Sequence, residues 1–252
     1  MEWLILLALG AFVGLLAGLF GIGGGLILVP ALSLLLPILD LASNEQALAI
    51  AIATTLASVA ITGSAAAITH IRSGNVDWLS VRKLTLGIAV GGICGALLTS
   101  SLPINHLGIA FGVIELLIAL QMLLGKQPSS SQTEPSWLAS SAFGWFSGML
   151  SALIGIGGGT INTPWLVWHG ISLPVAIATS SLLGVIIGIA GTATHLGSDL
   201  IQWTTLLILV SASLITAPLG ATLTHRLPIQ TLKRGFSLLI FALGMVMLVK
   251  FA

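Results

Sequence analysis

The five-residue stretch Gly-Ile-Gly-Gly-Gly occurs twice in this chain, at residues 21–25 and at residues 155–159. Each copy interrupts an apolar run and is followed by a proline at the same distance, as in GIGGGLILVP (21–30) and GIGGGTINTP (155–164). Glycine-dense backbone is costly in a hydrocarbon environment unless it is buried in protein or lines a cavity. The two stretches are therefore the first candidates for a functional site.

The composition around these stretches excludes a soluble domain. Of the 252 residues, 56% are hydrophobic and 6% are charged, with a mean hydropathy of +1.14, whereas roughly a quarter of a soluble domain is charged. The formal net charge of +1 gives no indication of nucleic-acid binding. The single cysteine, Cys94, excludes an internal disulfide or a CxxC pair. We conclude that the chain is an integral membrane protein.

The two halves of the chain repeat one another. The segment that begins at Trp3 recurs at Trp137, with a constant offset of 134 residues through both glycine stretches. Beyond them the offset is 125 residues, which aligns Trp78 with Trp203. We interpret this pattern as an internal duplication, with repeats at 1–125 and 137–252 joined by a polar linker at 126–136.

Apolar runs, compared with the roughly 20 residues that a helix needs to span a bilayer, predict five helical elements in each repeat. They are 3–20, 26–39, 47–70, 80–102 and 105–125, followed by 137–154, 160–172, 175–196, 203–224 and 230–250. The second element of each repeat is short, so we expect it to form a helical hairpin with the first, tipped by the glycine stretch. The pattern is compatible with hairpins that cross the membrane and with hairpins that re-enter it. The expected fold is an all-α polytopic membrane protein in which each repeat comprises a hairpin and three transmembrane helices.

The distribution of basic residues predicts how the repeats are oriented, because short cytoplasmic loops carry an excess of Lys and Arg. Two loops are bordered by basic residues, namely Arg72, Arg82 and Lys83 at the first and Arg226, Lys233 and Arg234 at the second. The equivalent loops of the other repeat, 196–203 and 101–108, contain none. Equivalent loops of opposite character predict that the repeats are inverted relative to each other and that both termini are extracytoplasmic.

The glycine stretches have the features of an anion site at a helix terminus. They lack the GK[ST] of a P-loop and do not match GxGxxG. Glycines that end one helix and start another leave backbone N–H groups free at the new N-terminus, where the helix dipole favours an anion. Two such tips entering from opposite sides meet near the membrane centre in transporters with inverted repeats. The candidate ligands are Gly21, Gly23, Gly24, Gly25, Gly155, Gly157, Gly158 and Gly159. The alternative is a tight turn in which glycine serves close packing.

The sequence resembles the sulfite exporter (TauE/SafE) family of bacterial membrane transporters. The resemblance covers essentially the whole chain and is specific at Gly23-Gly24-Gly25 with Pro30 and at the matching residues 157–159 with Pro164. It implies an exporter in the inner membrane for a small sulfur-containing anion, such as sulfite, a sulfonate or another organosulfur anion. An anion channel that uses the same tips as a filter is the alternative. No serine lies in a GxSxG elbow, and we do not expect an enzyme.

Polar side chains near the tips are further candidate ligands. The helix after each hairpin carries hydroxyls at Thr54, Thr55 and Ser58 in the first repeat and at Thr179 and Ser180 in the second. Asn162 and Thr163 follow the second tip, where the first repeat has Leu28 and Val29, so we expect them to set selectivity. Buried hydroxyls equally bond carbonyls of their own helix, which is the alternative for these positions.

Three ionisable residues lie in apolar segments. Glu115 is within FGVIELLIAL, and a carboxylate at membrane depth is a candidate for proton coupling. His70 and His195 occupy equivalent helix ends and are gating candidates, because histidine titrates near neutral pH; the alternative is that they cap helix ends. The other histidines lack metal-ligand spacing. We therefore expect no metal, no cofactor and no nucleic acid, and partners limited to the anion, a coupling proton or ion, and the bilayer.

Overall fold

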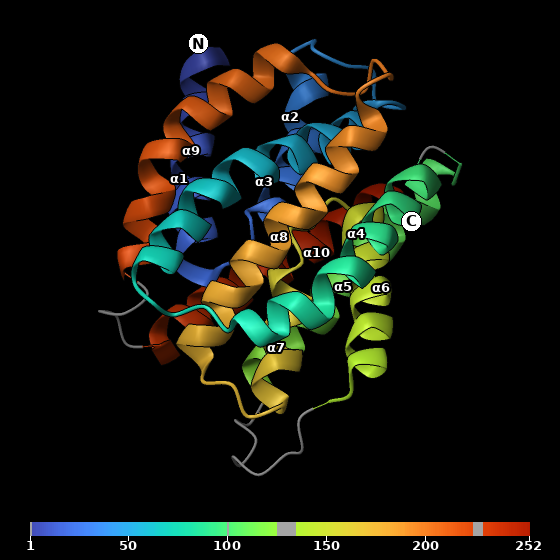
Figure 1. Cartoon of the computed structure of the whole chain (residues 1–252). Coiled ribbons are helices and arrows are strands. Elements are labelled where there is room, and N and C mark those ends of the chain that lie inside the picture. The colour runs from blue at the N-terminus through green and yellow to red at the C-terminus, as the bar shows by residue number, and fades with distance from the viewer. Residues whose placement is uncertain (1, 100, 125–134, 224–228) are drawn as a thin grey trace.

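The computed structural model describes residues 2–99, 101–124, 135–223 and 229–252, and within them every regular element is a helix (Figure 1). The ten helices are α1 (Glu2–Phe20), α2 (Gly25–Ile38), α3 (Ala47–Arg72), α4 (Trp78–Thr99), α5 (Ile104–Leu124), α6 (Trp137–Leu153), α7 (Gly159–Trp168), α8 (Leu173–His195), α9 (Trp203–Leu223) and α10 (Ile229–Phe251). This confirms the all-helical fold and the order of elements. Most of the expected linker, with Lys126, and the loop residue Arg226 lie outside the described residues.

Among the described residues, six helices are long and apolar enough to cross a membrane, namely α1, α3, α4, α5, α8 and α9. The elements expected to be short are short, since α2 has 14 residues and α7 has 10. The prediction that the second of these extends to residue 172 was wrong. The helix ends at Trp168 because Gly170 has a φ of +85° and the amides of Gly170 and Ile171 bond back to Val167 and Leu166, which is the usual glycine termination.

The helices α3 and α8 form the centre of the molecule. In their spans 78% and 67% of residues are buried, compared with 39–44% in the other four candidate spans. They pack against each other, and α8 crosses the middle of the view in Figure 1. The pair α1 and α9 lies on one side of them and the pair α4 and α6 on the other. The two helices that begin at the glycine tips, α2 and α7, pack against this buried centre.

The main packing contacts join the first half of the chain to the second. The most extensive helix pairs are α4 with α6, α1 with α9, α5 with α10 and α3 with α8. Two of these contacts use stripes of glycines spaced four residues apart, with Gly10, Gly14 and Gly18 facing α9 and Gly87, Gly91 and Gly95 facing α6. A Cβ at any of these positions would meet the facing helix, so close helix approach explains the stripes.

The two arms of each expected hairpin make little contact with each other. The helix α2 packs mainly against α3, and α7 packs mainly against α8, while α1 with α2 and α6 with α7 touch only slightly. The arms therefore diverge from their glycine tip.

Candidate functional site

The two glycine tips touch each other at the centre of the fold. A Cβ added at Gly157 would lie 2.9 Å from Cα of Gly23, and one added at Gly23 would lie 3.1 Å from Cα of Gly157. The flanking glycines pair in the same antiparallel order, Gly21 with Gly159 and Gly25 with Gly155. The backbones are too close for any side chain at this crossing. A bound anion would therefore contact the flanks of the tips, because the crossing itself is filled by backbone.

Each tip starts a new helix without a side-chain cap. The N-cap residues Gly24 and Gly158 have φ values of +78° and +72°, and neither helix has a side-chain hydrogen bond at its cap. In α7 the amides of Ile161 and Asn162 both bond to the carbonyl of Gly158, at 3.1 and 2.9 Å. The N–H groups of the helical residues before Ile161 have no acceptor within the helix. They present the positive end of the helix dipole, which suits an anion.

Unpartnered polar side chains gather at the second tip. Asn162 is fully buried, and neither its amide oxygen nor its amide nitrogen has a hydrogen-bond partner. Ser151, at the end of α6, is also fully buried with an unpartnered hydroxyl. A Cβ at Gly158 would lie 3.0 Å from Nδ2 of Asn162 and 3.7 Å from Oγ of Ser151, so both groups flank this glycine. The hydroxyls of Thr160 and Thr163 are likewise buried and unpartnered.

The first tip has an apolar counterpart at each of these positions. Subtracting the offset of 134 residues from Ser151, Thr160, Asn162 and Thr163 gives Ala17, Leu26, Leu28 and Val29. The sequence singled out Asn162 and Thr163 by this comparison, but it missed Ser151 and Thr160. Both follow from the same offset, and their chemistry becomes evident only because the fold leaves their hydroxyls without partners.

The hydroxyls of α3 and α8 divide into two kinds. Oγ1 of Thr54 accepts the backbone N–H of Gln202 at 3.0 Å, and Oγ1 of Thr179 accepts that of Asp77 at 3.0 Å. These contacts hold the starts of α9 and α4, so these two threonines have a structural role and retain one hydroxyl hydrogen to donate. Thr55 and Ser180, the adjacent equivalent pair, are fully buried with unpartnered hydroxyls. Ser58 is buried one turn further along α3.

The ionisable candidates lie apart from this cluster. Glu115 is fully buried on α5 against Gly244 of α10, and neither carboxyl oxygen has a partner. His70 is buried at the end of α3, with Nε2 3.3 Å from the carbonyl oxygen of Gly18. His195 is buried at the end of α8, and its Nε2 has no partner. Among the described residues, no three His, Cys, Asp or Glu side chains are grouped to hold a metal ion.

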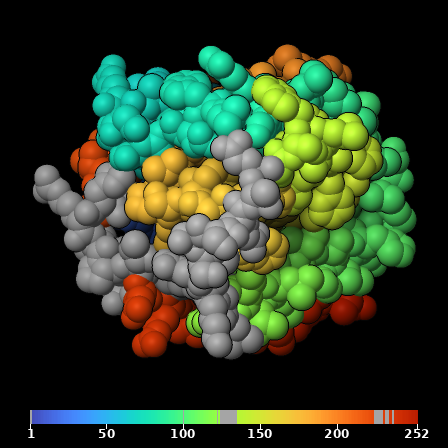
Figure 2. Space-filling view, turned by 60° about the horizontal axis from the view of Figure 1, so that its bottom comes forward, coloured from blue at the N-terminus to red at the C-terminus, as the bar shows by residue number. Residues whose placement is uncertain are grey.

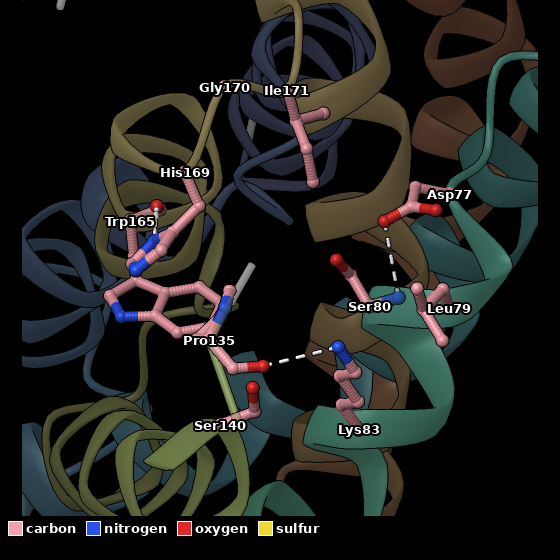
Figure 3. A pocket seen from close by; sticks show the side chains of 10 residues that line it. All are labelled: Asp77, Leu79, Ser80, Lys83, Pro135, Ser140, Trp165, His169, Gly170 and Ile171. Carbon is pink, nitrogen blue, oxygen red and sulfur yellow. Dashed lines mark hydrogen bonds between the residues drawn. The ribbon is translucent and has the colours of Figure 1, made fainter. Parts of the chain in front are cut away.

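A pocket of about 270 Å³ opens beside the far end of α7 (Figure 3). Its lining comprises Asp77, Leu79, Ser80, Lys83, Pro135, Ser140, Trp165, His169, Gly170 and Ile171. Nζ of Lys83 donates to the carbonyl of Pro135 at 3.2 Å, and the carboxylate of Asp77 accepts the N–H of Ser80 at 3.2 Å. Figure 2 shows this face, where the end of α7, in gold, lies between the teal start of α4 and the yellow-green α6. The pocket was not predicted, because its walls come from segments far apart in sequence.

Comparison with known proteins assigns a class to this fold and site. The chain is 34% identical over 260 residues to a probable membrane transporter protein of Haemophilus influenzae, which covers 98% of both chains. It is 26% identical to the probable membrane transporter protein YunE of Bacillus subtilis, over 97% of this chain and 96% of that one. No solved structure matches the chain. The class is thus that of multi-pass membrane transporters, and the chain is not an enzyme.

Within this class the family is defined by a match that covers nearly the whole chain. The model of the sulfite exporter TauE/SafE family matches residues 6–247. The chain therefore belongs to the sulfite exporter TauE/SafE family, which confirms the resemblance seen in the two glycine stretches.

Proposed function

We propose that the protein is a secondary transporter that exports a small sulfur-containing anion, such as sulfite, a sulfonate or another organosulfur anion. The anion binds beside the second glycine tip, near the membrane centre. Family membership supports the transport of a small substrate. The residues around Gly158 support the place and the charge of that substrate.

The observation that carries this proposal is the amide of Asn162. Buried polar side chains are nearly always hydrogen-bonded, yet this one has two unpartnered polar atoms and no exposure to solvent. It projects from the first turn of α7, where free backbone N–H groups and the helix dipole attract negative charge. An anion at this place accepts hydrogen bonds from the amide nitrogen, from Ser151 and from the backbone.

The ligands proposed here are neutral, because none of the described Lys or Arg side chains lies at either tip. Arg72, Arg82 and Lys83 border the start of α4, while Arg234 and Lys250 lie on α10. Backbone and hydroxyl donors without a fixed positive charge bind an anion less tightly than an arginine clamp does. Modest affinity is suited to a carrier, which must also release its substrate.

Alternating access then requires two arrangements of the same helices. Inverted repeats supply this possibility in other secondary transporters. Here α10 packs against α2, and Nζ of Lys250 bonds to the carbonyl of Ser33, whereas the equivalent pair, α5 and α7, lacks extensive contact among the described residues. We propose that the α5–α10 pair moves relative to α7, because α5 and α7 lack extensive contact among the described residues. A C-terminal reporter found in the cytoplasm would contradict the proposed orientation, with both termini extracytoplasmic in a bacterial inner membrane.

Counterflow in proteoliposomes tests the function directly. We expect saturable exchange with at least one of sulfite, thiosulfate or small sulfonates, and weaker exchange with carboxylates of similar size. Asn162→Leu should raise the substrate concentration needed for half-maximal exchange. Flux that rises in proportion to the gradient without saturation would instead support an anion channel with the same tips as its filter.

A further inference from the structure

Two facing helix surfaces connect the pocket to the second tip. On α7, Asn162, Trp165 and His169 are three and seven residues apart, which places them within about 60° of one another on the helix. His169 and Trp165 line the pocket, and Asn162 flanks Gly158. At a rise of 1.5 Å per residue, Asn162 lies about 10 Å along the helix axis from His169. One face of α7 therefore runs from the pocket to the buried amide.

The facing arm carries a matching row of hydroxyls. On α6, Ser140, Ser147 and Ser151 are seven and eleven residues apart, within about 20° of one line along the helix. Ser140 lines the pocket, and Ser151 flanks Gly158 at the tip. All three are fully buried, although Ser140 and Ser147 bond carbonyls of their own chain segment and only Ser151 is unpartnered. Polar groups thus follow both arms from the pocket to the tip.

Two aromatic rings close the space between the arms. Phe143 of α6 stacks on Trp165 of α7, with ring centroids 4.6 Å apart and planes inclined by 9°. The ring of His169 also packs against Trp165, with ring centroids 4.3 Å apart, and its Nδ1 is 2.7 Å from the carbonyl oxygen of Trp165. Helical side chains point back towards the helix N-terminus, so Trp165 covers the turn that carries Asn162. Trp165 thus forms part of the pocket wall and, through its contact with Phe143, lies between the pocket and the turn that carries Asn162.

The first hairpin has none of these features. The residues equivalent to Ser140, Phe143, Ser147, Ser151, Asn162, Trp165 and His169 at the offset of 134 are Leu6, Leu9, Val13, Ala17, Leu28, Ala31 and Leu35. All seven are apolar and none is aromatic. The polar row and the aromatic stack are therefore features of the second hairpin and not of the first.

We propose that the pocket is the vestibule through which a small anion reaches the second tip, and that Trp165, stacked on Phe143, is the gate between them. This inference rests on the proposed function, because it takes the surroundings of Asn162 as the substrate site. The vestibule volume is about nine times the roughly 30 Å³ that a water molecule occupies in the liquid. It therefore holds a small anion with part of its hydration water. Lys83 supplies positive charge at its wall, while the carboxylate of Asp77 is partly compensated by the N–H of Ser80.

Thiol labelling tests the gate without requiring transport. In a Cys94→Ala background, Ser151→Cys places a reactive thiol beyond the stack, and the probe is the anionic reagent 2-sulfonatoethyl methanethiosulfonate applied to oriented vesicles. We expect slow labelling in this parent and at least a tenfold faster rate when Trp165→Ala or Phe143→Ala is added, from the vestibule side only. Trp165→Phe retains a stacking ring and should label at the parent rate.

Two controls make the result specific. Trp168→Ala removes an exposed tryptophan from another face of the same helix and should leave the labelling of Ser151→Cys unchanged. Ala17→Cys, the equivalent position in the first hairpin, should stay unlabelled with or without Trp165→Ala. If the labelling rate of Ser151→Cys is the same with and without Trp165→Ala or Phe143→Ala, in protein that remains monodisperse, then the aromatic stack is not a gate. If Asn162→Leu transports normally while the labelling rate still depends on Trp165, the proposed binding site is wrong. The proposed path from the vestibule through the aromatic gate would then still hold.

Discussion

Replacing Asn162 by leucine should stabilise the fold while weakening transport. The two side chains have the same branching, so Asn162→Leu keeps the shape and changes two unpartnered polar atoms into methyl groups. A buried polar group without a partner costs about 1–3 kcal/mol. We therefore expect the free energy of unfolding in detergent to rise by about 2 kcal/mol, roughly a 30-fold change in the folding equilibrium.

The same change should weaken substrate binding. A hydrogen bond to a charged group contributes about 1.5–3 kcal/mol, so we expect KM for the exported anion to rise by about 10- to 150-fold, measured as initial rates in proteoliposomes. The matched control is Thr62→Val, which removes a buried hydroxyl that bonds Oγ of Ser213 at 2.6 Å. This control should lose about 1 kcal/mol of stability and keep its KM. A destabilised Asn162→Leu protein with normal transport would refute the reasoning.

Three further predictions concern other parts of the site. Gly157→Ala drives a Cβ against Gly23 across the crossing of the tips; we expect transport below a tenth of the wild-type rate with normal membrane insertion, and normal rates would show that the crossing tolerates displacement. Thr54→Val removes the acceptor for the N–H of Gln202 and should lower the free energy of unfolding by about 1 kcal/mol, as measured by thermal denaturation; an unchanged midpoint would argue against the structural role. Glu115→Gln should abolish the pH dependence of transport if this buried carboxyl carries the coupled proton, and a pH–rate profile identical to wild type would remove it from the mechanism.

The sequence predicted those parts of the fold that depend on residues close together in the chain. Apolar length gave the ten helices, and the constant offsets identified the glycine stretches as equivalent elements that meet. The four-residue spacing of Gly10, Gly14 and Gly18 favours a close helix neighbour, but it does not show that this neighbour is α9 from the other half. Partner identity depends on contacts between distant segments, which periodicity within one helix does not contain.

For the candidate site, the sequence likewise showed which residues were polar but not which contacts they make. Asn162 stood out because it is polar where the equivalent residue of the first repeat, Leu28, is apolar. The structure adds that the side-chain amide of Asn162 has no hydrogen-bond partner. The hydroxyls of Thr54 and Thr179 were visible in the sequence, but their hydrogen-bond partners lie 148 and 102 residues away. Trp165 and Phe143 resembled ordinary apolar helix residues, and only the fold brings their rings together.

The central claim is that the second tip, beside Asn162, holds the transported anion. The most direct measurement is a structure determined with an anion that contains an anomalous scatterer, such as selenite or a brominated sulfonate, under conditions where counterflow is saturated. We expect one anomalous peak within hydrogen-bond distance of the Asn162 amide and the first amides of α7, and none beside Leu28 at the first tip. A peak at both tips, or a saturating anion bound away from Asn162, would contradict it.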